Sequence, residues 1–143
     1  MVVLLSASAV CGCNRHSVGS HPGIAQVDPR LAQLLRSRTD ALLRHMVVGD
    51  LENLRQFFPP DAEVNVRDQL RRYLGASRRR SRVAGWDGEQ IVVELSTDHR
   101  RARTGVLVDF QESGGQVIQT SKIVFNWVSA DETCETYHLV PLE

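Results

Sequence analysis

The chain has 143 residues, a formal net charge of zero at pH 7 and an ordinary apolar share of 42%. This length suits one domain with its own hydrophobic core. The balanced charge gives no overall field that would favour nucleic acid, and no run reaches the ~18 apolar residues that a membrane-spanning helix needs. We therefore expect a single folded domain without a nucleic-acid partner.

The first thirteen residues, MVVLLSASAVCGC, are apolar and then small, as in a segment that is processed on export. Within them, Val10, Cys11, Gly12 and Cys13 resemble the bacterial lipoprotein box, in which an aliphatic residue, a tolerant position and a small residue precede the acceptor cysteine. This resemblance implies that Cys13 carries lipid and anchors the chain to a membrane of the bacterial cell envelope. Export segments usually begin with a basic region. Because Arg15 is the first basic residue here, we expect the true start to lie upstream.

Other interpretations of this segment remain open. Cleavage after Ala9, which follows a small-x-small pattern, would give an unlipidated periplasmic or secreted protein. Four residues have the chemistry of zinc ligands, namely Cys11, Cys13, His16 and His21. Their C-x-C spacing is tighter than structural zinc sites use, so we expect neither a metal nor a cofactor. Cys134 lies in a strand-like segment and is expected to be a buried thiol.

Residues 14–28 are rich in Gly, Ser, Pro and His and predict a flexible tether. A domain over residues 29–143 follows and begins with helices. Asp28 before Pro29 is a typical helix start, and glycine at position 49 predicts its end. A second helix is expected from 51 to 58, before a pair of prolines, and a third is expected to end at residue 74.

After residue 82 the apolar pattern changes to a period of two, which predicts strands. The expected ranges are 82–86, 89–97, 102–112, 116–129 and 133–140. Asp87 and Gly88 predict a two-residue hairpin turn between the first two strands. Helices followed by a run of strands predict an α+β fold, with the helices packed on one face of a curved antiparallel sheet meander.

Two stretches carry a family resemblance. ALLRHMVVGDLENLRQFFPPDAEV resembles the opening of nuclear-transport-factor-2-like domains, and KIVFNWV followed by ETYHLV resembles the long paired strands that end them. The resemblance implies a cystatin-like roll over residues 29–143. Some members of that superfamily are cyclases, isomerases or dehydratases, with their sites in the cone between sheet and helices. Many relatives also pair sheet to sheet.

One face of the predicted sheet is apolar and is expected to pack on the helices. We expect only Tyr73, Trp127 and Tyr137 to bring polar tips into the cone, and these are the candidates for lining a ligand pocket. General acid–base catalysis needs an ionisable group within hydrogen-bond reach of the substrate. An apolar cone therefore favours a binding protein over an enzyme.

The other face is mixed and carries Glu94, Asp109 and His138. These three residues are the alternative acid–base candidates, if a bulge turns them inward. The sequence thus predicts a non-catalytic envelope lipoprotein that binds a partner protein or a small apolar ligand. The alternatives are a small cyclase- or isomerase-type enzyme and a scaffold module that forms a homodimer through the mixed face.

Overall fold

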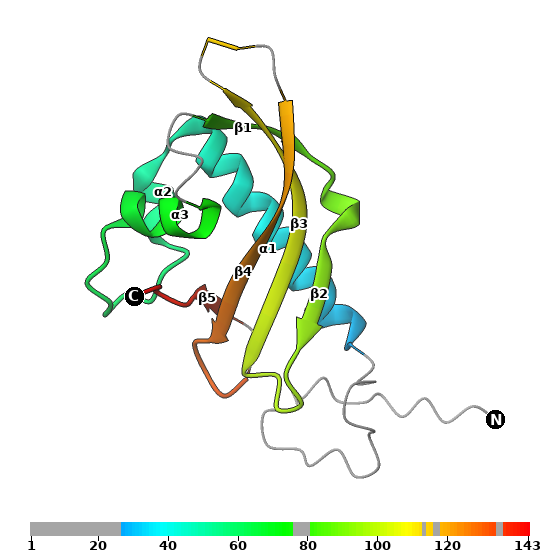
Figure 1. Ribbon diagram of the computed structural model, residues 1–143. Coiled ribbons are helices and arrows are strands. Elements are labelled where there is room, and N and C mark those ends of the chain that lie inside the picture. Colours follow the sequence, from blue (N-terminus) through cyan, green and yellow to red (C-terminus); the bar gives the residue numbers. More distant parts are fainter. Residues whose placement is uncertain (1–26, 76–80, 113, 116–117, 134–135) are drawn as a thin grey trace, which may run out of the picture.

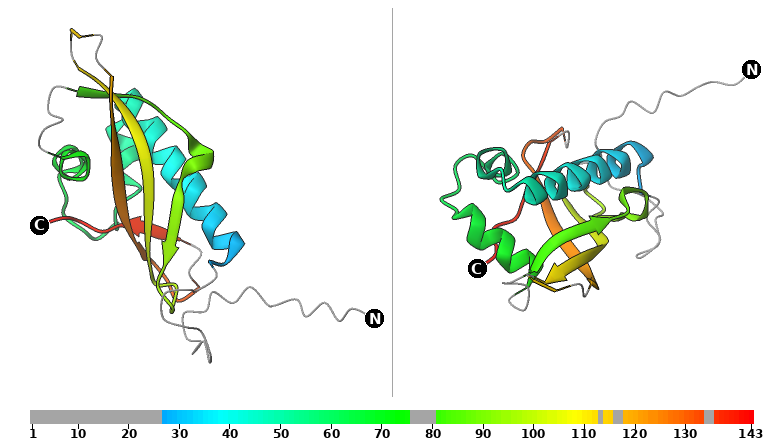
Figure 2. Two further views of the ribbon diagram at one scale, coloured as in Figure 1. Left: turned by 45° about the vertical axis from the view of Figure 1, so that its right-hand side comes forward. Right: turned by 90° about the horizontal axis from the view of Figure 1, so that it is seen from above.

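The computed structural model describes residues 27–75, 81–112, 114–115, 118–133 and 136–143. The predicted lipid site Cys13, the zinc candidates and Cys134 lie outside these residues, as does most of the predicted tether. The architecture confirms the predicted α+β class, because the helices come first and pack on one face of a curved antiparallel sheet (Figure 1). Figure 2 shows the long first helix running along that face.

The first helix, α1, spans Pro29–Val48 and has both predicted ends. The Asp28 carboxylate accepts a hydrogen bond of 2.9 Å from the backbone N–H of Arg30, which satisfies a donor at the helix start. Gly49 ends the helix with φ of 75°, a left-handed conformation that glycine adopts at low cost.

The second helix, α2, spans only Leu51–Arg55, so the prediction that it would continue to residue 58 is wrong. Pro59 and Pro60 lack the N–H groups that would bond to the carbonyls of Arg55 and Gln56 one turn earlier. The Arg55 carbonyl accepts instead from the backbone N–H of Phe58, and the Gln56 carbonyl accepts from the Arg38 guanidinium. The Phe57 carbonyl accepts from the backbone N–H of Leu139 in the strand Tyr137–Leu139. Tertiary contacts therefore replace the last helical turn.

The third helix, α3, spans Val66–Leu74 and ends before Gly75 as predicted. It contacts the strand Ile118–Ser129 and lies beside the C-terminal segment (Figure 1). Gln69 fixes this segment through a pair of hydrogen bonds with the backbone of Leu142, at 2.9 and 2.7 Å. The helix is thus attached to the sheet by polar as well as apolar contacts.

The strands are β1 (Ser81–Trp86), β2 (Val92–Leu95), β3 (Arg101–Glu112), β4 (Ile118–Ser129) and β5 (Tyr137–Leu139). All neighbours are antiparallel, in the order β1–β3–β4–β5, with β2 also paired to β3. The last strand is shorter than the predicted range of 133–140, since residues 131–133 form a turn.

The predicted hairpin at Asp87 and Gly88 is wrong. β1 and β2 do not pair with each other; both pair with β3, one after the other, and form an interrupted edge strand. Between them Asp87 caps a short 3₁₀ turn, η2 (Gly88–Gln90), and accepts a hydrogen bond of 2.9 Å from the N–H of Glu89. This aspartate turn lets the chain continue forward rather than reverse.

The two faces of the sheet are as predicted. The inner face is buried, including Val108 and Phe125 at 0% exposure and Trp127 at 1%, and Phe58 meets it from the helical side at 1%. Two buried polar side chains in this core were not foreseen, Thr39 of α1 and Thr104 of β3.

Candidate functional site

The two tyrosines predicted to line a pocket are instead part of the core. The Tyr73 hydroxyl donates to the carbonyl of Val140 and lies 3.3 Å from that of Asn126. The Tyr137 hydroxyl donates to the carbonyl of His99 at 2.5 Å. Burial raises the pKa of each phenol to about 12. Both groups therefore stay protonated near neutral pH, and neither can accept a proton from a substrate.

The third predicted pocket residue, Trp127, begins a buried hydrogen-bonded chain. Its indole N–H donates to the Thr104 hydroxyl at 2.9 Å, and that hydroxyl lies 2.8 Å from the Thr39 hydroxyl. The Thr39 hydroxyl lies 2.8 Å from the carbonyl of Leu35. Each member has a partner, so this chain links the sheet to α1 inside the core.

Glu94, Asp109 and His138 lie apart on the outer face of the sheet. Glu94 is exposed and pairs in register with Arg103 of β3, whereas Asp109 lies six residues further along that strand, about 20 Å at the usual strand rise. His138 sits on β5, the opposite edge strand. The structure does not bring the three together, and none of them reaches the interior.

The buried residues in the described part of the chain include no Asp, Glu, His, Lys or Arg. Among all the residues that the structure describes, no three His, Cys, Asp or Glu side chains cluster closely enough to hold a metal ion. No helix in the described ranges is both long and apolar enough to cross a membrane. A candidate site must therefore be sought on the surface of the domain.

A groove of about 780 Å³ lies between α1 and the segment formed by β1 and η2. We call it the α1–β1 groove. Its walls are formed by Gln33, Arg36, Ser37, Asp40, Arg44, Gly85, Trp86, Gly88 and Glu89. The helical members recur at intervals of three and four residues, so they lie on one face of α1. The opposite wall comes from the interrupted edge strand.

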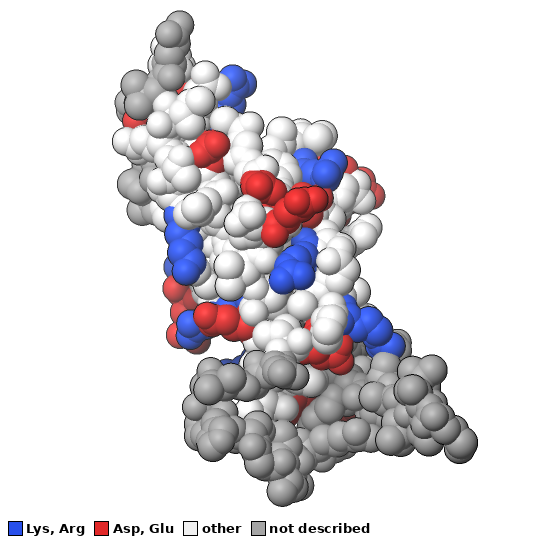
Figure 3. Space-filling view, turned by 90° about the vertical axis from the view of Figure 1, so that its right-hand side faces the viewer, with Lys and Arg blue, Asp and Glu red and all other residues white. Residues whose placement is uncertain are grey.

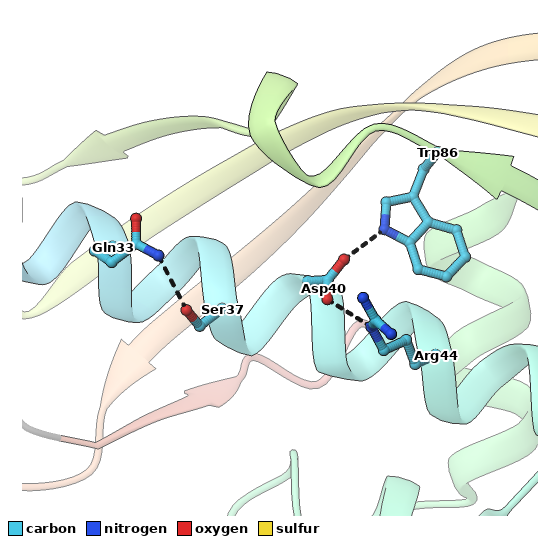
Figure 4. A network of polar contacts seen from close by, with 5 residues as sticks. All are labelled: Gln33, Ser37, Asp40, Arg44 and Trp86. Carbon is cyan, nitrogen blue, oxygen red and sulfur yellow. Dashed lines mark hydrogen bonds and ion pairs between the residues drawn. The ribbon is translucent and has the colours of Figure 1, made fainter.

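Asp40 is the centre of a polar network in this groove (Figure 4). One carboxylate oxygen accepts from the Trp86 indole N–H at 2.9 Å, and the other accepts from the Arg44 Nε at 2.7 Å. Burial opposes ionisation of Asp40, but hydrogen bonds from Arg44 and Trp86 outweigh it and lower the pKa of the carboxyl below its ordinary value. Asp40 is thus ionised and fixes the indole against the helix.

Glycine at position 88 leaves room for this arrangement, because a larger residue would displace the Asp40 side chain. A Cβ atom there would lie 2.9 Å from the Asp40 carboxylate, closer than real Cβ contacts allow. Three residues on, the backbone also supplies a contact, because the Arg36 Nε donates to the carbonyl of Ile91 at 3.0 Å. The groove is therefore held in shape by hydrogen bonds from α1 to both Trp86 and the residue before β2.

Reasoning from the sequence missed this groove. The spacing of Arg36, Asp40 and Arg44 could have indicated a charged stripe, but such stripes are typical of a solvated helix face. Figure 3 shows basic and acidic side chains interspersed on the side of the molecule that it presents. Recognition in such a setting depends on the positions of individual charges rather than on a field of one sign.

No protein-family model, curated protein or solved structure matches the chain. The resemblance to nuclear-transport-factor-2-like domains therefore stays a prediction from sequence.

Proposed function

We propose that this chain is a non-catalytic, lipid-anchored protein of the bacterial cell envelope, and that its domain binds a ligand or partner in the α1–β1 groove. The observation that supports the binding role is the contrast between the interior of the domain and the α1–β1 groove. The interior is apolar and its polar tips all have protein partners, whereas the groove is open and lined by charged groups and an indole. Among the residues that the structure describes, a cyclase or isomerase site in the cone would lack a buried ionisable group that could move a proton.

The anchor is supported by the sequence of residues 10–13 and is tested by fractionation. We expect the wild-type chain to sediment with membranes and Cys13→Ser to be released or left unprocessed. Cys11→Ser is the matched control, because it changes a neighbouring thiol at the tolerant position, and it should fractionate as wild type. Mass spectrometry of the mature N-terminus should find a diacylglyceryl group on Cys13. A soluble wild-type chain that begins at Val10 would contradict the anchor.

The groove is tested with Trp86 as a reporter. The chain has two tryptophans, Trp86 in the groove and Trp127 in the core, so an NMR spectrum shows two indole N–H signals. Trp86→Phe assigns them. A mixed screen of anionic, cationic and neutral small molecules should yield some that shift the Trp86 signal saturably and leave Trp127 unchanged. If no molecule does so, and envelope extract does not either, the groove is not the binding surface.

A second candidate function, a homodimeric scaffold, is favoured by the outer face of the sheet. Four large apolar side chains are exposed there across three strands: Val92 (58%), Leu107 (58%), Ile118 (59%) and Val124 (39%). Val92 and Val124 flank Gly105 of β3, and Leu107 lies two residues further along that strand. Exposed apolar surface of this kind can mark an interaction site. Sedimentation should then give a dimer that Leu107→Glu dissociates. Val48→Glu, on a residue at the end of α1 that is more exposed than Leu107 (79% against 58%), is the control and should leave the mass unchanged.

A further inference from the structure

The α1–β1 groove contains more hydrogen-bond donors than its own residues use. Arg36 uses its Nε on the carbonyl of Ile91, and Arg44 uses its Nε on Asp40. Within the described residues, neither guanidinium makes a hydrogen bond or an ion pair through its two terminal nitrogens. Each arginine thus keeps a planar pair of N–H groups, the geometry that binds a carboxylate through two parallel hydrogen bonds.

The negative charges of the groove leave Arg36 without a counter-ion. Asp40 is committed to Trp86 and Arg44, with Arg44 as its ion-pair partner. Glu89 is exposed on the opposite wall and forms no ion pair with either arginine in the described part of the chain. Arg36 is partly buried and its orientation is fixed by the bond to Ile91. A fixed, partly desolvated cation without an ion-pair partner favours an anionic ligand.

Trp86 supplies a flat apolar wall in the same groove as Arg36. Its N–H is held by Asp40, so the ring is fixed, and Gly85 and Gly88 add no side chains beside it. Planar groups pack well on such a ring. Arg36 precedes Asp40, the residue that holds the ring, by one helical turn, about 6 Å along the axis. The groove volume is ample for a small molecule that carries both an aromatic ring and an acid group.

We propose that the α1–β1 groove binds small aromatic carboxylates, with the carboxylate on the terminal nitrogens of Arg36 and the ring against Trp86. This proposal rests on the proposed function, because it names the ligand class of the same groove. Glu89 should oppose binding of such a ligand, since it places a second negative charge in the groove. The charges therefore predict opposite effects for changes at Arg36 and Glu89.

The test is a titration of the full chain, purified in detergent, with indole-3-acetate, followed by the two indole N–H signals. We expect the Trp86 signal to shift saturably and the Trp127 signal to stay in place. Arg36→Gln should weaken binding about tenfold or more, the usual loss for a charge-assisted pair. Glu89→Gln should strengthen binding by a smaller factor. Arg30→Gln makes the same change on the same helix outside the groove and should leave the affinity unchanged.

Three comparisons would overturn the ligand class. Equal affinity for indole-3-acetamide would show that the carboxylate is not recognised. Tighter binding of tryptamine, with Arg36→Gln improving it, would show a cation site. Tighter binding of phenyl phosphate than of phenylacetate would show a phosphate site. In each case a shifted Trp86 signal would still support the groove as the binding surface, so failure of the ligand class is distinct from failure of the proposed function.

Discussion

Replacing Thr104 by valine tests whether the buried hydrogen-bonded chain stabilises the domain. Valine keeps the size and branching of threonine and suits a strand, so little cavity forms. The change leaves the indole N–H of Trp127, a side chain only 1% exposed, without its acceptor. An orphaned buried donor costs about 1–3 kcal/mol. Thr39 loses a partner as well but keeps its contact with the Leu35 carbonyl.

We therefore expect Thr104→Val to lower the free energy of unfolding by about 2–3 kcal/mol, out of the ~5–15 kcal/mol that is typical of a domain. Urea unfolding followed by far-ultraviolet circular dichroism measures this loss. Thr120→Val changes an exposed threonine on β4 and, as the control, should stay within about 0.5 kcal/mol of wild type.

A double-mutant cycle with Trp127→Phe identifies the cause of the loss. Phenylalanine has no N–H to orphan, so Thr104→Val should cost about 1–2 kcal/mol less in that background. An equal cost in both backgrounds, or a Thr104→Val variant as stable as wild type, would refute the reasoning.

Three further predictions concern the core and the titration of the folded domain. Phe125→Ala should cost about 3–5 kcal/mol of unfolding free energy, measured by the same urea assay, because the ring is fully buried; a loss below 1 kcal/mol would contradict that burial. Tyr73 and Tyr137 are the only tyrosines, and their pKa is raised to about 12, so native protein at pH 10.5 should show almost no tyrosinate absorbance. The stability that these phenols contribute is complete below their unfolded pKa near 10 and declines as pH rises from there towards 12. The pKa of His138 is lowered by burial and by nearby arginines, so its NMR titration midpoint should fall below 6.5. The stability that His138 contributes is present above pH 6.5 and is lost as the pH falls below that value. His138→Gln should therefore flatten this part of the curve of unfolding free energy against pH.

Local patterns in the sequence were enough to predict the parts of the fold that depend on neighbours in the chain. Asp28 and Gly49 mark the ends of α1 because capping is decided within a few residues. The strict alternation of buried and exposed residues in β3 follows from the period of a strand. The same alternation placed Glu94, Asp109 and His138 outside the core.

The features that the sequence did not predict depend on contacts between distant residues. Arg38 donates to the carbonyl of Tyr137, 99 residues away, and the same guanidinium donates to the carbonyl of Gln56, the residue after α2. The Thr39–Thr104 contact joins residues 65 apart. The α1–β1 groove likewise exists only because Trp86 meets a helix that lies 46 residues earlier. No local rule specifies such pairs, and Asp-Gly sequences fit both a reversal and a forward turn.

The interrupted edge strand has a consequence for solubility. A long, flat edge offers unpaired backbone groups to which other chains can add, and this addition starts many aggregates. Here the edge is divided into pieces of six and four residues, with an irregular step between Val83 and Gly85. On the other side of the sheet, β5 has three residues and pairs with the end of β4. The divided edge formed by β1 and β2 gives a second chain little regular backbone for a stable extension, so we expect this edge to resist such addition.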